Sequence, residues 1–271
     1  MIRYLQNNLT LFLALLSLPL LSQESDLFNE YNTAKFAQFL FESNQYSFAA
    51  EEYERLTFLF PGNQDYQVAL MRSYRYARDY GKGIYAFQSL ISPGLEVQKE
   101  YAKLNILDRN KANIAALLTD LDQGSSFRNN LDLTLRILSF PDNPLSLEGI
   151  QTDRVDENLM NLYQESLKIN YKSPFLAGTF SMVIPGMGKV YSGRWKDGLI
   201  SFLFIGTTAY QAYRGFGQKG TKSVYGWIMG SLSLGFYIGN IYGSAKAAKL
   251  YNSNMNSAYV EKVSHYYIDH F

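Results

Sequence analysis

The feature that most constrains this chain is an apolar stretch near its C-terminus in which glycines recur every four residues. The stretch carries two such runs, Gly226 and Gly230 followed by Gly235, Gly239 and Gly243. On an α-helix, small residues four apart lie on one face, and a second helix can approach that face closely. The stretch therefore predicts a helix that packs tightly against another helix.

Two apolar segments, at about 198–214 and 223–248, are candidates for transmembrane helices, the first a short one. The loop between them carries three positive charges and no negative one, so the positive-inside rule places it in the cytoplasm. We expect a transmembrane helical hairpin, whose glycine faces also offer a route to homo-oligomers. The polar residue Asn240 lies inside the second segment, where we expect its amide to hydrogen-bond across helices, with lipid or substrate binding as the alternative.

The segment that precedes the hairpin, Pro174 to Ile184, is too short to span a bilayer and ends in a Pro-Gly-Met-Gly cluster. A re-entrant or interface-lying helix is expected there. Cationic and aromatic residues that suit lipid headgroups follow the cluster, and an aspartate precedes the next helix as a candidate N-cap. The expected membrane-interface turn consists of Pro185, Gly186, Gly188, Tyr191, Gly193, Arg194, Trp195 and Asp197.

The N-terminus has the pattern of a secretory signal peptide. Arg3 precedes an apolar core from Leu9 to Leu21, and Ser22 supplies a small residue for cleavage. An uncleaved anchor is the alternative, but the apolar core is shorter than the ~20 residues that span hydrocarbon. We expect residues 1–22 to be removed. Because the chain has no cysteine, disulfides and cysteine metal sites are excluded.

The two halves of the chain carry opposite charge. Residues 23–171 hold 14 Lys and Arg against 21 Asp and Glu, whereas residues 172–271 hold 10 against 3. The basic residues flank apolar runs and form no long block, which favours a lipid bilayer as the partner of this half and argues against nucleic acid.

From Leu27 to about Ile169, apolar residues recur at spacings of three and four, which predicts helices throughout this part of the chain. When the chain is aligned with itself so that Ala49 stands opposite Gly83, Leu56 stands opposite Leu90. In the stretch from 34 to 61, Ala37 and Ala49 stand where two helices would touch. The stretch resembles a tetratricopeptide repeat, both in its residue pattern and in the number of residues that separates the aligned positions.

The resemblance implies a helical-repeat solenoid with a concave surface that holds a protein partner. A solenoid that only spaces or stabilises the membrane part is the alternative. The tail from Ser173 also resembles a family of bacterial envelope proteins, through Pro-Gly-x-Gly-x-x-Tyr-x-Gly at 185–193 and Gly-Phe-Tyr-x-Gly-Asn-Ile-Tyr-Gly at 235–243, and is loosely similar to TM2-type modules. That resemblance implies a membrane-associated repeat protein and brings no catalytic residues; Lys189 stands where such proteins often carry glutamine.

A cluster of tyrosines and arginines marks a candidate partner surface in the acidic half. Tyrosine and arginine are enriched at protein interfaces, although such a helix can also be a solvated face with buried tyrosines. The residues are Arg72, Tyr74, Arg75, Tyr76 and Arg78.

Motifs for catalysis or cofactors are weak. Gly215 to Gly220 matches a dinucleotide fingerprint but lacks the strand before it and the acidic residue after it. The only histidines, His265 and His270, are too few for a metal site and fall in a tail, 253–271, that we expect to fray. We predict no enzyme, cofactor or metal.

The sequence thus predicts an all-α protein, a helical-repeat solenoid at 23–172 followed by a transmembrane hairpin at 173–252. The expected function is a non-enzymatic interaction scaffold in the bacterial inner membrane with its repeat domain in the periplasm. The alternative is an accessory factor in membrane-protein or lipid and envelope biogenesis that acts through its tail.

Overall fold

The computed structural model describes residues 28–140 and 145–271. Within these ranges the regular structure is helical and contains no strand, which confirms the prediction of an all-α chain. The predicted signal peptide, residues 1–22, lies outside the described residues. The chain divides into two compact units, unit 1 up to Asn110 and unit 2 from Lys111.

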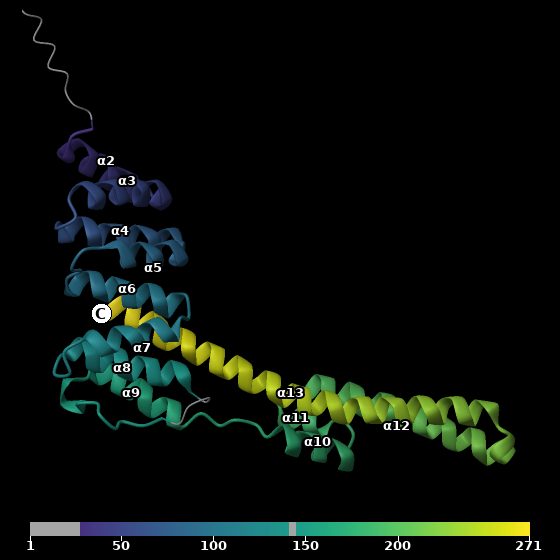
Figure 1. Ribbon diagram of the computed structural model, residues 1–271. Coiled ribbons are helices and arrows are strands. Elements are labelled where there is room, and N and C mark those ends of the chain that lie inside the picture. Colours follow the sequence, from purple (N-terminus) through teal and green to yellow (C-terminus); the bar gives the residue numbers. More distant parts are fainter. Residues whose placement is uncertain (1–27, 141–144) are drawn as a thin grey trace, which may run out of the picture. The chain divides into compact units, whose positions relative to one another are not determined.

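Unit 1 is a succession of helices that pack on their neighbours in chain order (Figure 1). The helices are α2 (Glu30–Glu42), α3 (Tyr46–Leu59), α4 (Gln64–Ala77), α5 (Tyr80–Ser89) and α6 (Leu95–Leu107). The interval from the start of α2 to the start of α4 equals the interval from the start of α3 to the start of α5. It is also the interval that places Ala49 opposite Gly83, so the spacing found by aligning the sequence with itself is the spacing of helix pairs.

The same turn recurs at the end of α2, α4 and α6. Each time a residue other than glycine adopts a positive φ, and the next backbone N–H donates to the carbonyl five residues earlier, which closes the helix end. The positive-φ residues are Asn44 (60°), Arg78 (59°) and Arg109 (58°). The closing bonds are Gln45 to Leu40 (2.9 Å), Asp79 to Tyr74 (3.1 Å) and Asn110 to Asn105 (2.9 Å).

Small residues allow the helices of unit 1 to approach closely. Ala37 and Ala49 are completely buried, as the sequence predicted for the contact between α2 and α3. At Gly83 of α5, an added Cβ would come within 2.9 Å of both the Tyr74 Cβ and a Leu104 methyl group. Only glycine therefore fits this contact without a shift of its neighbours.

Unit 2 contains two shorter groups of helices joined through one long helix. The elements are α7 (Lys111–Asp120), α8 (Ser126–Ser139), the 3₁₀ turn η1 (Thr152–Arg154), α9 (Glu157–Leu167), α10 (Pro174–Val183), α11 (Met187–Tyr191), α12 (Trp195–Lys219), the 3₁₀ turn η2 (Gly220–Lys222) and α13 (Val224–His270). Helices α12 and α13 form a hairpin closed by η2, with α10 and α11 packed against α13 (Figure 1).

The predicted helical hairpin is present, but its helices do not meet the requirements of a membrane span. No helix in the described ranges combines the necessary length with sufficient apolar character. Glycine, serine, tyrosine and Asn240 alternate with the apolar residues of α13, and charged residues occupy both ends of α12. This finding corrects the prediction of transmembrane helices at about 198–214 and 223–248, and with it the prediction of a protein anchored in the bacterial inner membrane.

The last part of the chain is helical where a frayed tail was expected. Helix α13 continues to His270 because neither glycine nor proline follows Gly243. Its C-terminal part contacts α8 and α9, and the Tyr266 hydroxyl donates to the Asp156 carboxylate at the start of α9 (2.5 Å). Residues 253–271 therefore belong to the same compact unit as α7–α9, and the division falls at Asn110 instead of near Ser173.

Candidate functional site

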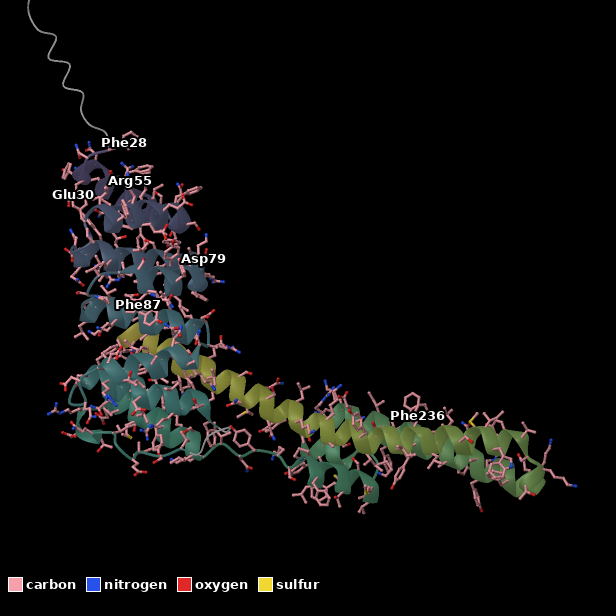
Figure 2. The ribbon with its side chains drawn as sticks, viewed as in Figure 1. Phe28, Glu30, Arg55, Asp79, Phe87 and Phe236 are labelled. Carbon is pink, nitrogen blue, oxygen red and sulfur yellow. The ribbon has the colours of Figure 1, made fainter. Side chains whose placement is uncertain are left out.

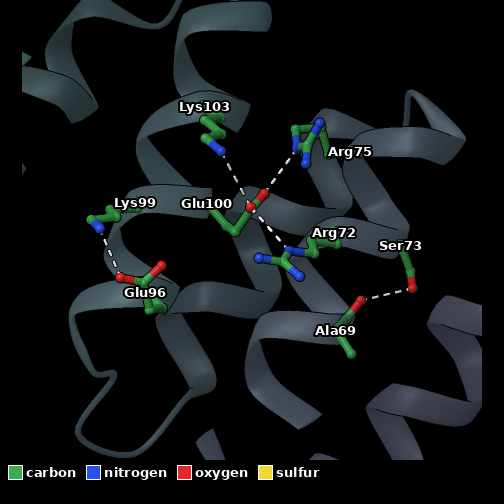
Figure 3. Close-up of polar contacts among 8 residues, drawn as sticks. All are labelled: Ala69, Arg72, Ser73, Arg75, Glu96, Lys99, Glu100 and Lys103. Carbon is green, nitrogen blue, oxygen red and sulfur yellow. Dashed lines mark hydrogen bonds and ion pairs between the residues drawn. The ribbon is translucent and has the colours of Figure 1, made fainter. Parts of the chain in front are cut away.

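The most heavily charged buried group in the described part of unit 1 is Glu100 of α6. Its side chain is only 4% exposed and receives cations from two helices. The Arg75 Nε lies 2.8 Å from one carboxylate oxygen, and the Arg72 Nε lies 3.2 Å from the other. The Lys103 Nζ, one turn along α6, lies 3.5 Å from that second oxygen. Figure 3 shows one carboxylate holding three cations, so the cluster has an excess of positive charge.

The pKa of Glu100 reflects this environment. Burial on its own raises the pKa of a carboxyl group, but the charge and hydrogen bond of Arg75, together with Lys103 and Arg72, outweigh that effect. The pKa of Glu100 therefore lies below its ordinary value. The carboxylate stays ionised at neutral pH and fixes the positions of the arginines.

Arg72 connects this cluster to a groove of about 470 Å³. We define the unit 1 groove by its lining residues, which come from α2, α3, α4 and α6. They are Phe41, Tyr53, Gln64, Asp65, Val68, Ala69, Arg72 and Glu96. The Arg72 side chain is 49% exposed, and its Nε bonds to Glu100, so its guanidinium is held at the wall of the groove while part of it remains open to solvent.

An aromatic group adjoins the groove through Phe41. The Phe41 ring makes edge contacts with Tyr46 and Tyr76, at centroid distances of 5.1 and 5.4 Å, and the two tyrosines stack at 5.2 Å. The Arg75 guanidinium lies 4.6 Å from the centre of the Tyr76 ring. Tyr76 nevertheless remains 49% exposed, so the groove is flanked by an accessible aromatic surface.

The structure separates the five residues of the predicted partner surface. Arg72, Arg75 and Tyr76 lie together around the groove and the Glu100 cluster. Tyr74 is buried and donates its hydroxyl hydrogen bond to Glu54, and burial, with that bond, raises the pKa of its phenol. Arg78 is exposed at the turn after α4.

Sequence reasoning missed two residues that complete this site, Glu100 and Phe41. They belong to α6 and α2, whereas the predicted surface lies on α4 and the turn that follows it. No local pattern connects either residue to the arginines. The only available signal is the repeat itself, which places the first helices of successive pairs next to one another.

The residues of the predicted membrane-interface turn form a compact corner in unit 2. Gly186 (φ 88°) and Gly193 (φ 80°) have left-handed backbones. An added Cβ would collide with the Gly198 backbone at Gly186 and with the Ala177 backbone at Gly188. Arg194 precedes the first residue of α12 and pairs with Asp197, which lies in the first turn and does not cap the helix.

Three further residues complete this corner. Pro185 lies between α10 and α11, and the Tyr191 hydroxyl accepts from the Ser173 N–H (3.2 Å). Trp195 is 59% exposed beside Lys196.

The glycines of α13 have two different environments. At Gly226 an added Cβ would come within 2.9 Å of the Phe216 ring, so this glycine does receive α12 closely, and Gly230 faces Ala212. Gly235 and Gly239 have no atom within 4 Å of that position. Gly243 faces the Lys189 side chain at 3.6 Å. Self-association through the open glycines stays a prediction.

The expected interhelical hydrogen bond of Asn240 does not form, and serines supply it instead. Asn240 is 4% exposed, yet neither atom of its amide has a hydrogen-bond partner among the described residues. The Ser181 and Ser244 hydroxyls lie 2.7 Å apart and link α10 to α13. Ser181 also accepts from the Gly188 N–H (2.9 Å), which ties α11 to the same point.

Within 28–140 and 145–271, no group of three His, Asp or Glu side chains is placed to hold a metal ion. The chain was also compared with known proteins. No family model, no curated protein and no solved structure matches it.

Proposed function

We propose that unit 1 is a recognition module that binds an extended segment of a partner protein in its groove, without catalysis. The observation that carries the proposal is the half-exposed Arg72 side chain, which Glu100 holds beside an apolar and aromatic wall. Arginine and aromatic side chains in a concave surface are the residues that contribute most to protein interfaces.

The repeated architecture supports this proposal. The first two helix pairs, α2 with α3 and α4 with α5, begin at the interval found in the sequence, and the first helix of each pair ends in the same turn, which supports a likeness to the period and hairpin form of tetratricopeptide repeats. The groove is lined mainly by α4, with single residues from α2, α3 and α6. Stacked helix pairs of this kind present concave surfaces to extended ligands. We therefore propose that unit 1 is a divergent array of this type.

The chemistry of the groove selects among segments. Arg72 uses its Nε for Glu100, and no hydrogen bond of its terminal nitrogens is found among the described residues. These nitrogens can pair with a carboxylate from the partner, either an acidic side chain or a chain terminus. Phe41 and Val68 offer an apolar surface to a neighbouring side chain. The expected ligand is a short segment that combines one carboxylate with an apolar or aromatic residue.

A peptide selection with the full chain tests the proposal. Peptides displayed with free and blocked C-termini are selected on the full-length protein, and their affinities are measured for the wild type and for Arg72→Ala. We expect acidic, apolar peptides whose affinity falls about tenfold or more in the variant, because a charged hydrogen bond contributes roughly 1.5–3 kcal/mol.

The matched control is Arg78→Gly, which removes the same charge from the end of the same helix but lies outside the groove. We expect it to bind the selected peptides as the wild type does. Equal loss in both variants would mean that general charge governs binding, and a selection that yields no groove-dependent peptide contradicts the proposal.

A further inference from the structure

A second pocket, of about 330 Å³, lies in unit 2 between α12 and α13. Its walls are apolar, with Ile200, Phe204 and Ile205 from α12 and Phe236 from α13. The Phe204 and Phe236 rings meet edge to face at a centroid distance of 6.0 Å. Figure 2 labels Phe236 on the long helix α13. A pocket of this size and lining falls in the range of small-molecule sites.

Two glycines of α13 leave the space that forms this pocket. Gly235 and Gly239 line the pocket and have open space where a side chain would begin. Toward the closed end of the hairpin the same helices are in tight contact, since an added Cβ at Gly215 would come within 2.9 Å of the Gly226 backbone. The two helices therefore pack closely near η2 and leave room beside Asn240.

Asn240 is one of the lining residues, and its buried amide is unused. The residue is 4% exposed, and neither its Oδ1 nor its Nδ2 has a partner among the described residues. A buried amide without hydrogen bonds destabilises a fold. A ligand with a polar group at this position would satisfy it.

Lys189 of α11 brings a positive charge to the same pocket. Its ammonium donates to the Ser201 hydroxyl (2.7 Å), and no ion pair of Lys189 is found in the described ranges. The acidic group whose charge acts on it, Asp197, pairs with Arg194. Burial, and to a smaller extent the charge of Arg194, lower the pKa of Lys189, whereas Asp197 opposes them. The pocket therefore has a partly buried cation without a counter-ion.

We propose that this pocket binds a carboxylic acid with an apolar chain, of the medium-chain fatty acid class. The carboxylate accepts from the Lys189 ammonium and the Asn240 Nδ2, and the chain lies against Phe204, Ile205 and Phe236. One ammonium and one neutral amide match a single negative charge, whereas the two charges of a phosphate would call for a second cation. This site lies in unit 2 and is independent of the groove in unit 1.

Calorimetric titration of the full-length protein with decanoate, below its micellar concentration, tests the proposal. We expect saturable binding of one decanoate. Decanol, which lacks the charge, is expected to bind at least tenfold more weakly than decanoate. Decanoate is expected to bind at least tenfold more weakly to Lys189→Met or Asn240→Leu than to the wild type, because each change removes a hydrogen bond to the carboxylate.

Two glycine variants control for the exposed apolar surface of the hairpin. Gly239→Leu fills the pocket and should abolish binding, whereas Gly206→Leu adds the same side chain to α12 at a position with open space outside the pocket and should leave it unchanged. Circular dichroism checks that each variant is folded. If a glycine variant does not fold, Lys189→Met still tests the proposal. The proposal would be overturned if decanoate did not bind to the wild type, if decanol bound as tightly as decanoate, or if the wild type and all variants bound decanoate equally.

Discussion

Glu100 shows how one buried carboxylate fixes the wall of a groove whose arginines belong to a different helix. It holds Arg75 and Arg72 from α4 and Lys103 from α6. The sequence marked the arginines as a candidate surface, because their spacing is local. It did not reveal Glu100, because nothing in a single sequence tells which of many acidic residues will be buried opposite them.

The protonation of Glu100 gives a pH-dependent prediction. Its pKa is lowered in the folded state, so its contribution to stability is present above the unfolded-state value of about 4.3 and is lost as pH falls through the folded-state pKa. At pH 7 we expect Glu100→Gln to lower the unfolding free energy of unit 1 by about 3 kcal/mol, since three cations lose the carboxylate that they share.

The difference between wild type and Glu100→Gln should shrink as the pH falls from about 5 to below 4, because the wild type then loses the same charge. Urea unfolding followed by circular dichroism at several pH values measures it. A difference that stays constant down to about pH 3.5 would show that the carboxylate does not titrate in this way.

Two glycines of α5 provide a matched pair. We expect Gly83→Ala to destabilise the protein by roughly 1–3 kcal/mol, because the new methyl group meets the Tyr74 Cβ at 2.9 Å and overpacks the contact. Gly81→Ala, with open space around it, should stabilise the helix by up to about 1 kcal/mol. The midpoints of urea unfolding compare them, and a stabilising effect of both would show that α5 can move away from α4.

At the scale of elements, the repeating turns of unit 1 could not be recognised from the residues that form them. Asn44, Arg78 and Arg109 adopt positive φ without being glycine, so the usual signal for a helix end was missing. The interval between helix pairs could still be predicted, because apolar positions and small contact residues such as Ala49 and Gly83 repeat with it. Turn chemistry was thus less predictable than the period.

Arg78 allows a test of that turn. A positive φ destabilises a non-glycine residue by about 1–2 kcal/mol. Glycine avoids this strain, but part of the gain is lost because glycine has more conformational entropy in the unfolded chain. We expect Arg78→Gly to raise the unfolding free energy by roughly 0.5–1 kcal/mol, and Arg78→Val to lower it by more than about 1 kcal/mol, since a β-branched residue is least compatible with this conformation. Urea unfolding distinguishes the two, and equal effects would mean that the turn rearranges.

The hairpin of unit 2 shows the opposite limit of sequence reasoning. Its helices and their close contact at Gly226 could be predicted from the four-residue spacing. Its assignment to a membrane was wrong, because glycine, serine and tyrosine lower the apolar character of these helices below what a membrane span requires. The hydrogen bonds of Ser181 and Ser244, and the unused amide of Asn240, depend on which helix faces meet, and a single sequence does not show that.

At the scale of the whole molecule, the two compact units should unfold as separate steps. Both tryptophans, Trp195 and Trp227, lie in unit 2, so tryptophan fluorescence reports on unit 2 while circular dichroism reports on both units. We expect Glu100→Gln at pH 7 to shift part of the dichroism transition to lower urea and to leave the fluorescence midpoint unchanged. An equal shift of both signals would show that the units unfold together.

The central claim is that the unit 1 groove is where a partner protein binds. The most direct measurement is photo-crosslinking in living cells with a benzophenone amino acid, placed in the full-length chain at Asp65 in the groove or at Gln88, an exposed residue of α5 outside it. The account predicts a discrete crosslinked partner from position 65 that is lost when Arg72→Ala is added, and none from position 88. Crosslinks of equal yield from both positions, or from neither, would contradict it.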